Sequence, residues 1–406
     1  MHDADVIIFG AGLVGLTLAC ALDAHGVRSV LVDPADPAAQ LAPGFDGRAT
    51  AVASASWRML RAIGVGGPLE GRGCPIERIE VSDGLRPGGI RFDPGAPGDP
   101  LGVMFENRLL RAALRARAEA GGHVRLLQPA RAAAVERGAG GVRVRLADGA
   151  ELRAPLLVAA EGRNSPTREA AGIRVARWRY PHQAIVTAVG HERPHGNVAH
   201  EVFYPAGPFA LLPMLDGEDG RPRSAVVWSV PADRGEAYAA LPPRAFAAEL
   251  EKRMGGMLGA VGPVAPRSTY PLGFHHAARI TAERLALVGD AAHGIHPIAG
   301  QGLNLGFRDV AALAEVLVDG ARSGMDLGDP ILLERYGHWR GLDVLAVAAA
   351  TDGLTRLFGV PGRAASAVRR LGMAAVERVP AAKGWLMTEA RGESGELPAL
   401  LKGTLV

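Results

Sequence analysis

Three glycines near the start of the chain have the spacing of a dinucleotide-binding turn. Gly10, Gly12 and Gly15 (GAGLVG) lie between the apolar run Asp5–Phe9 and a segment with helical periodicity. In that setting the first glycine permits a tight turn, the second lets the backbone approach a pyrophosphate, and the third packs the helix against the strand. The phosphates are expected at the helix N-terminus, where free N–H groups favour an anion.

An acidic residue follows at the distance that this chemistry requires. Asp33 ends a second apolar run, Ser29–Val32, and its carboxylate is expected to accept hydrogen bonds from the ribose hydroxyls of an adenosine. The alternative is that the glycines serve only a tight turn. The strand, the helix and the acid together favour the dinucleotide.

A second acidic turn, Gly289-Asp290, lies far downstream, directly after the apolar run Leu285–Val288. An aspartate at a strand end among small residues suits a carboxylate that reaches the ribityl chain of a flavin. A Gly-rich loop from Pro297 to Asn304 then opens a helix, whose N-terminus would stabilise negative charge on a reduced flavin. The alternative for Gly289-Asp290 is a plain turn with a helix N-cap.

Other residues that often carry chemistry are expected to be inert here. His293 and His296 form an HxxH pair, but it lies in a loop, not at i,i+4 on a helix, and no further ligand set has recognisable spacing, so we expect no metal site. Cys20 falls inside the first predicted helix and Cys74 in a Gly-rich loop, with no framework of pairs.

The elements that position these residues indicate an α/β fold. The apolar runs are typical of buried parallel strands, and helices are predicted over Leu13–His25 and Leu303–Gly320. From His182 to Tyr270, alternating segments separated by Pro and Gly predict an antiparallel sheet. From Pro330 onward the pattern is mostly helical. We expect a Rossmann-like FAD-binding domain, a second domain built on an antiparallel sheet, and a C-terminal helical region.

The predicted domains interleave along the chain. The FAD-binding domain is expected at 1–76, 104–178 and 275–330, a substrate-binding sheet domain at 77–103 and 179–274, and the helical region at 331–406. The 406 residues, of which 48% are apolar, can supply two cores.

Composition excludes several classes of partner and location. The net charge of +3 is too small to imply nucleic acid. No stretch approaches the ~20 apolar residues of a membrane span, and the chain begins with MHDAD, without a basic region ahead of an apolar one. We expect a cytoplasmic protein.

The three glycine-bearing strand ends, the third being Glu161-Gly162, resemble the motifs of FAD-dependent aromatic hydroxylases of the para-hydroxybenzoate hydroxylase fold. Those motifs are GxGxxG, DG and GD. Within that fold the chain is most similar to the ubiquinone-biosynthesis hydroxylases of the UbiH/UbiF/VisC type, whose characteristic stretch resembles Val288–Val310 (VGDAAHGIHPIAGQGLNLGFRDV). Further similarity lies in Phe105–Leu110, His200–Pro213 and Glu396–Pro398.

The resemblance implies a set of FAD-binding residues. They are Gly10, Gly12, Gly15 and Asp33 for the ADP half, Gly289 and Asp290 for the ribityl chain, Pro297, Gly300, Gly302, Leu303 and Asn304 facing the isoalloxazine ring, Arg48 and Arg108 for the phosphates and flavin linker, and Glu161 with Gly162 in the DG motif. The alternative for either arginine is a surface charge. Glu161 departs from the aspartate of the family and adds one methylene group.

The implied activity is that of an FAD-dependent monooxygenase which hydroxylates a prenylated phenol of ubiquinone biosynthesis with O2, through a flavin C4a-hydroperoxide. No second GxGxxG is present, so the electron donor is either NAD(P)H that visits the active site or a reductase partner. A base would convert the phenol to the more reactive phenolate. His182, His200, Glu201 and Tyr204 are candidates, although polar strand residues are more often structural.

The prenyl tail implies peripheral contact with the inner membrane, or with a ubiquinone-biosynthesis complex, through Leu342–Ala350 and Ala364–Met373. The alternative is that these helices pack on their own domain.

Rival activities are those of an oxidase, a halogenase or a prenyl-chain reductase, and a further rival is a non-catalytic FAD-bound scaffold. Val226–Pro231 (VVWSVP) lacks the first tryptophan of the halogenase motif WxWxIP. The ring carbon that is hydroxylated and the oligomeric state stay open.

Overall fold

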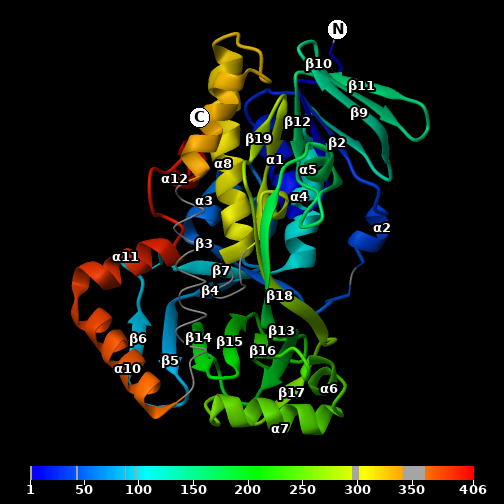
Figure 1. Cartoon of the computed structure of the whole chain (residues 1–406). Coiled ribbons are helices and arrows are strands. Elements are labelled where there is room, and N and C mark those ends of the chain that lie inside the picture. The colour runs from blue at the N-terminus through cyan, green and yellow to red at the C-terminus, as the bar shows by residue number, and fades with distance from the viewer. Residues whose placement is uncertain (1, 43, 87, 97, 295–300, 342–361) are drawn as a thin grey trace.

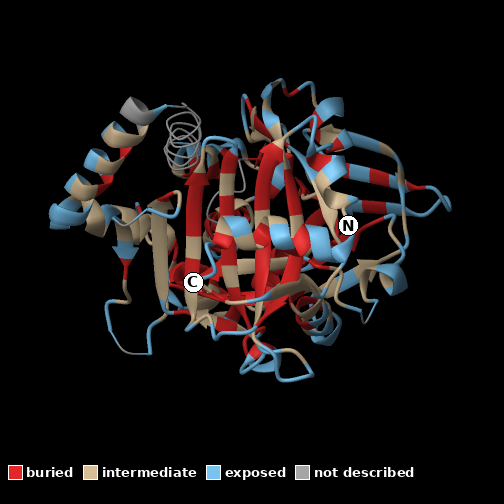
Figure 2. Ribbon diagram, turned by 90° about the horizontal axis from the view of Figure 1, so that it is seen from below, coloured by how far each residue is buried: buried red, intermediate tan, exposed pale blue. Residues whose placement is uncertain are grey.

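The computed structural model describes residues 2–42, 44–86, 88–96, 98–294, 301–341 and 362–406, with the backbone alone for 363–365. Within these ranges the strands form four sheets, and helices pack against the two largest of them (Figure 1). The strands are the most buried part of the molecule, and exposed residues gather on the helices and loops around them (Figure 2). The fold is α/β, as the sequence predicts.

The parallel sheet contains the strands that precede the predicted cofactor residues. Its order is β19-β20-β12-β1-β2-β8, and only the edge strand β19 runs antiparallel. Its strands are β1 (Val6–Phe9), β2 (Ser29–Val32), β8 (Val124–Leu127), β12 (Leu156–Ala159), β19 (Thr281–Ala282) and β20 (Leu285–Leu287). Side chains of β1 alternate between two buried faces, which explains its continuous apolar sequence.

Each face of the parallel sheet has its own covering layer. Val6 and Ile8 face the helices α1 (Leu13–Asp23), α4 (Asn107–Ala120) and α8 (Gln301–Arg322). Ile7 and Phe9 face a three-stranded antiparallel sheet. That sheet consists of β9 (Ala132–Gly138), β10 (Gly141–Leu146) and β11 (Glu151–Ala154).

The large sheet confirms the predicted antiparallel domain and adds strands from other parts of the chain. Its order is β21-β18-β13-β16-β15-β14-β5-β6, with β17 paired to β13, and all pairs are antiparallel except β14 with β5. Its strands are β5 (Arg78–Asp83), β6 (Gly89–Phe92), β13 (Val175–His191), β14 (Val198–Tyr204), β15 (Gly207–Met214), β16 (Arg223–Pro231), β17 (Val261–Pro263), β18 (Ser268–Ala277) and β21 (His293–Gly294). Phe246 and Leu250 of α7 (Pro243–Met254) pack on one face.

The exact domain limits stay a prediction. The strand β13 is continuous across the expected limit at 178/179, and β18 is continuous across the one at 274/275. These two strands therefore connect the large sheet to the neighbourhood of the parallel sheet without a linker.

A small antiparallel sheet, the bridging sheet, lies between the two larger ones (Figure 1). It consists of β3 (Ala49–Ala53), β4 (Cys74–Ile76) and β7 (Gly102–Glu106). Cys74 lies in its strand β4, not in the loop that the sequence predicts. Burial raises the pKa of the Cys20 and Cys74 thiols to about 12. Both thiols are therefore protonated near neutral pH and poorly nucleophilic.

The C-terminal part is helical, as predicted. A helix covers 330–341, followed in the described residues by α10 (Arg363–Arg378), α11 (Pro380–Ala390) and α12 (Ala399–Lys402). The predicted segment Leu342–Ala350 lies outside the described residues. Among the helices that the structure describes, none is long and apolar enough to cross a membrane. The remaining short helices are α2 (Pro37–Gln40), α3 (Ser54–Ala62), η1 (Gly67–Leu69), α5 (Pro166–Ala170), α6 (Gly235–Ala239) and η2 (Gly289–Ala291).

Candidate active site

Four neighbouring strands of the parallel sheet, β20, β12, β1 and β2, end at one edge of that sheet. The residues that follow them are Gly289, Glu161, Gly10 and Asp33. Neighbouring strands lie about 4.8 Å apart, so these turns meet although they are far apart in sequence. Ligands of open α/β sheets bind at this carboxyl edge.

The glycine turn has the shape that a pyrophosphate needs. Gly10 has a left-handed φ of +103°, and a Cβ there would lie 2.4 Å from the carbonyl oxygen of Ala160. A Cβ on Gly15 would lie 1.9 Å from the carbonyl oxygen of Gly10. By contrast, a Cβ on Gly12, ahead of α1, would meet nothing within 4 Å. Tight packing on both sides of one open position is the arrangement expected of a phosphate-binding turn.

Asp33 supports the same turn. Its Oδ2 accepts the backbone N–H of Ala11 at 2.7 Å, and its Oδ1 accepts the N–H of Ala35 at 2.7 Å. Each carboxylate oxygen has a second lone pair for a ribose hydroxyl. The residues of this edge therefore fit an adenosine diphosphate group.

Asp290 fits the ribityl end of a flavin. Gly289 has a φ of +60° and packs against Val14, so the turn approaches the start of α1. The Asp290 side chain is exposed at the strand end, and within the described residues it makes no hydrogen bond or ion pair. His275 donates from Nε2 to the Asp290 carbonyl at 2.7 Å, which fixes the backbone of the turn.

A buried carboxylate that sequence reasoning missed holds this turn from behind. Asp309, on α8, accepts the Gly289 N–H at 2.8 Å and the Nε2–H of His293 at 2.7 Å through Oδ2. Its Oδ1 accepts Nε–H of Arg340 at 2.7 Å. Burial alone would raise the pKa of Asp309, but His293 and Arg340 outweigh it and hold that pKa below its ordinary value. The Nε2 atom of His293 is thus bound to Asp309.

Glu161 lies at the expected strand end and binds the turn that follows it. Its Oε2 accepts the Ser165 hydroxyl at 2.6 Å and the Thr167 N–H at 3.2 Å. Gly162 has a left-handed φ of +79°, which a side chain would strain. The role of this carboxylate toward a cofactor stays a prediction.

Arg48 and Arg108 come from adjacent segments, because Asn107 donates its N–H to the Arg48 carbonyl at 3.0 Å. Their guanidinium groups bind different acids. Arg48 contacts Asp46 at 2.6 Å, and Arg108 contacts Glu106 at 2.6 Å. Their contacts with FAD stay predictions.

The first turn of α8 contains the next predicted residues, Gly302, Leu303 and Asn304. Asn304 is buried and binds the bridging sheet through both ends of its amide, donating to the Ala51 carbonyl and accepting the Ala53 N–H, each at 2.9 Å. This pair of bonds fixes the start of α8 beside β3. Pro297 and Gly300 lie outside the described residues.

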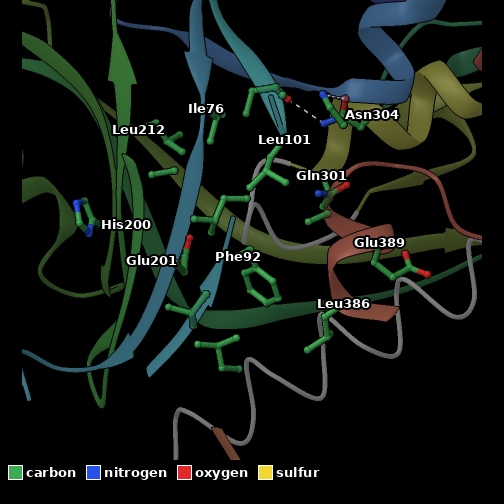
Figure 3. Close-up of a pocket in the computed structure, with 18 of the residues that line it drawn as sticks. Ile76, Phe92, Leu101, His200, Glu201, Leu212, Gln301, Asn304, Leu386 and Glu389 are labelled. Carbon is green, nitrogen blue, oxygen red and sulfur yellow. Dashed lines mark hydrogen bonds between the residues drawn. The ribbon is translucent and has the colours of Figure 1, made fainter. Parts of the chain in front are cut away.

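An apolar cavity of about 230 Å³ begins at this turn of α8 (Figure 3). Gln301 and Asn304 lie at one side, strands of the bridging and large sheets form the walls, and α11 contributes Trp385 and Leu386. Most of the lining side chains are aliphatic or aromatic, among them Ile76, Ile79, Val81, Ile90, Phe92, Leu101, Phe203 and Leu212.

The three histidine and tyrosine candidates for a base are not brought together in this cavity. The imidazole of His200 lies on the face of β14 opposite Glu201 (Figure 3), 3.6 Å from Oε2 of Glu80, and burial lowers its pKa. Tyr204 donates to the Arg253 carbonyl at 2.6 Å beside α7. His182, on β13, does not line the cavity. His200 and the buried Glu201 both line the cavity, and the catalytic role of all four candidates stays a prediction.

Comparison with known proteins agrees with this geometry. Residues 3–349 match the family model described as "FAD binding domain". The chain is 47% identical to "Ubiquinone hydroxylase UbiL" of Rhodospirillum rubrum, covering 98% of this chain and 93% of that protein. It is 33% identical to "3-demethoxyubiquinol 3-hydroxylase" of Escherichia coli, covering 96% of this chain and 98% of that protein.

A solved structure shows the same fold. It is that of PqsL, "a probable FAD-dependent monooxygenase" from Pseudomonas aeruginosa, with a TM-score of 0.76 and 25% identity over 93% of this chain and 100% of that one. The predicted FAD cofactor and enzyme class are confirmed. The chain belongs to the FAD-dependent monooxygenase family that includes the ubiquinone-biosynthesis hydroxylases.

Proposed function

We propose that this protein hydroxylates the aromatic ring of a prenylated phenol intermediate of ubiquinone biosynthesis, with O2 as the oxygen source. The observation that carries the proposal is the apolar cavity at the first turn of α8. Its walls suit a ring with a hydrocarbon tail, because burying apolar surface contributes about 25 cal/mol per Å². The turn of α8 is where the flavin ring is expected.

The charges around the cavity favour a neutral phenol over an aromatic acid. Its described lining contains no Arg or Lys, and its acidic members are Glu201 and Glu389. A substrate carboxylate would find no cation there and would lose its hydration without compensation. We therefore expect para-hydroxybenzoate to be a poor substrate.

We propose that the carboxyl edge of the parallel sheet binds FAD. The open side of Gly12 would receive the pyrophosphate, Asp33 the ribose and Asp290 the ribityl chain. FAD supplies the activation of O2, which no protein side chain can perform. The protein must orient the substrate ring and exclude water from it, and the apolar walls of the cavity do both.

Electrons would come from NAD(P)H or from a reductase partner.

We further propose peripheral contact with the inner membrane and association with a ubiquinone-biosynthesis complex. The supporting observation is the size of the cavity: at about 230 Å³ it can take the ring and the beginning of a prenyl tail. It is smaller than the ~300–1,000 Å³ of typical ligand pockets, so a long tail must extend outside it.

The test is product analysis with labelled oxygen. Purified FAD-loaded protein is supplied with a reductant, ¹⁸O₂ and a prenylated phenol, and mass spectrometry records whether the product gains one labelled atom. We expect label in the ring and reductant consumption that depends on the phenol. Consumption without labelled product would indicate an oxidase, and saturation of the prenyl chain would indicate a reductase.

A matched pair of variants tests the cavity itself. Leu212→Trp adds bulk to the cavity wall, whereas Leu215→Trp makes the same change three positions later at an exposed site. We expect Leu212→Trp to lower kcat/KM for the prenylated phenol by about tenfold or more, the equivalent of ~1.4 kcal/mol. Equal values in the two variants would place the substrate elsewhere.

A further inference from the structure

The helical hairpin formed by α10 and α11 exposes apolar side chains on its outer side. It lies at the edge of the large sheet, beside β5 and β6 (Figure 1). Four large apolar residues of this hairpin are strongly exposed: Val368 at 64%, Leu371 at 71%, Val379 at 48% and Trp385 at 54%. Isolated exposed apolar residues are common, but a group on one short element marks a surface that binds something.

The inner side of α10 is held by polar groups. Arg369 binds Asp83 at 3.1 Å, with both side chains nearly fully buried, and Ser366 donates to the same carboxylate. Near the end of the helix, Glu377 accepts the backbone N–H of Arg91 at 3.2 Å. Among the α10 side chains that the structure describes, Met373 is the buried apolar one, and it packs in a cluster with Phe203, Val81 and Ile90. An ordinary surface helix buries its apolar stripe and exposes its charges, whereas α10 buries Arg369 and exposes Val368 and Leu371.

The exposed apolar residues of α10 form a stripe. Val368 and Leu371 are three positions apart, which places them within one sector of α10 at 3.6 residues per turn, and Val379 follows the helix as its C-cap with an extended backbone. The exposed Arg378 borders this sector. Between 362 and 390 the sequence has five basic residues and two acidic ones. Apolar side chains flanked by basic ones are the composition of helices that lie in a membrane surface.

The hairpin is continuous with the substrate cavity. Trp385 is both half-exposed and part of the cavity lining, and Leu386, Glu389 and Ala390 of the same helix line it as well (Figure 3). A molecule that leaves the cavity past α11 would therefore reach the exposed side of the hairpin. An indole at such a boundary suits a membrane interface, where one part of the ring is wet and the other is in hydrocarbon.

We propose that the α10–α11 hairpin docks on an anionic lipid bilayer and admits the prenyl tail of the substrate directly from that bilayer. The inference rests on the proposed function, because it assumes a tailed substrate in the cavity. Docking would spare the tail an exposure to water. Arg369 and Lys383 are bound to Asp83 and Glu377, so the attraction to anionic lipids comes from other basic residues, of which the exposed Arg378 borders the apolar stripe.

The first experiment measures co-sedimentation of the FAD-loaded protein with vesicles of phosphatidylcholine, with and without phosphatidylglycerol. We expect binding to the anionic vesicles, weakened by salt. The double variant Val368→Ser/Leu371→Ser should reduce this binding by about tenfold or more, since two exposed apolar side chains are lost. Ile331→Ser is the matched control, because Ile331 is 67% exposed but lies outside the hairpin.

The second experiment separates docking from catalysis. The same proteins are assayed with a long-chain prenylated phenol in anionic vesicles and with a short-chain phenol in vesicle-free buffer. Docking predicts that the double variant loses turnover of the long-chain phenol and keeps turnover of the short-chain one. If the parent converts neither phenol, the proposed function fails, and vesicle binding still decides the docking.

Three outcomes would overturn the docking proposal. One is a parent protein that does not bind anionic vesicles. Another is vesicle binding that is equal in the parent and the double variant. The third is a parent that forms a dimer which the double variant cannot form, with no vesicle binding, since the stripe would then join two copies of this chain.

Discussion

Asp309 and His293 form a buried pair, with 2.7 Å between Oδ2 and Nε2, and the same oxygen accepts the Gly289 N–H. Because Asp290 is the next residue, this pair fixes the backbone from which the proposed ribityl ligand projects. The Asp309 carboxylate is fully buried and also binds Arg340. Removing one member of such a group leaves uncompensated charge in the interior, which is strongly destabilising.

Asp309→Asn should therefore lower the free energy of unfolding by about 3 kcal/mol, the lower end of the range for broken buried pairs, because the amide oxygen can still accept one hydrogen bond. FAD affinity should fall with it. Urea unfolding and FAD titration measure both. Asp319→Asn is the control on the same helix: Asp319 pairs with Arg335 at the surface, with side chains 40% and 46% exposed, and should cost under ~1 kcal/mol. Similar losses in both variants would contradict a special role for Asp309.

Two glycines of one motif should respond differently to the same substitution. A Cβ at Gly12 meets nothing within 4 Å, so Gly12→Ala should fold with a parental Tm without FAD and lose FAD affinity, because the methyl group takes the place of the phosphate. Gly15→Ala should unfold at a lower temperature even without FAD, since its Cβ would lie 1.9 Å from the Gly10 carbonyl oxygen. Thermal unfolding of the FAD-free proteins distinguishes them. Parental FAD affinity in Gly12→Ala would place the pyrophosphate elsewhere.

Local signals in the sequence predict the parallel sheet and its strand ends well. The runs before Gly10, Asp33 and Asp290 are apolar because each strand is buried on both faces. Such a run can be recognised in the sequence without knowing which elements pack against the strand. The sequence does not predict which face of the large sheet each side chain lies on. His200 and Glu201 are neighbours, so they face opposite sides of β14, and only the register of the sheet decides which side has the cavity.

Contacts between side chains of distant segments could not be predicted from the sequence either, because they depend on how the elements pack together. The group of His293, Asp309 and Arg340 joins β21, α8 and the helix at 330–341. Asp309 lies inside Val288–Val310, the stretch that resembles the family, but its position in that stretch does not indicate a buried charge. The part of α11 that lines the cavity is also distant in sequence from the strands opposite.

Stability should decrease as pH falls below 6.5. Burial lowers the pKa of His275 and His276 below the ordinary value of 6.5, so the folded protein resists protonation that the unfolded chain accepts. The unfolded state then binds more protons between the two pKa values, and the free energy of unfolding falls with falling pH across that window. His275→Gln should make the slope shallower, because its amide can still donate to the Asp290 carbonyl but does not titrate. Urea unfolding on both sides of pH 6.5 measures the slope.

The parent protein, measured under the same conditions, is the reference for this slope. A slope in His275→Gln as steep as in the parent would show that the pH dependence arises from other groups.

Glu161 offers a test in which charge and contacts can be separated. Its two hydrogen bonds, from Ser165 and Thr167, both end on Oε2, and Gln can keep them through its amide oxygen. Glu161→Gln should therefore change the free energy of unfolding by under ~1 kcal/mol and still slow turnover, because it removes a negative charge at the proposed cofactor edge. Glu161→Asp restores the residue type of the family and should be tolerated better. Turnover, FAD affinity and urea unfolding of both variants decide the matter: parental turnover in Glu161→Gln would mean that the carboxylate only stabilises the turn into α5.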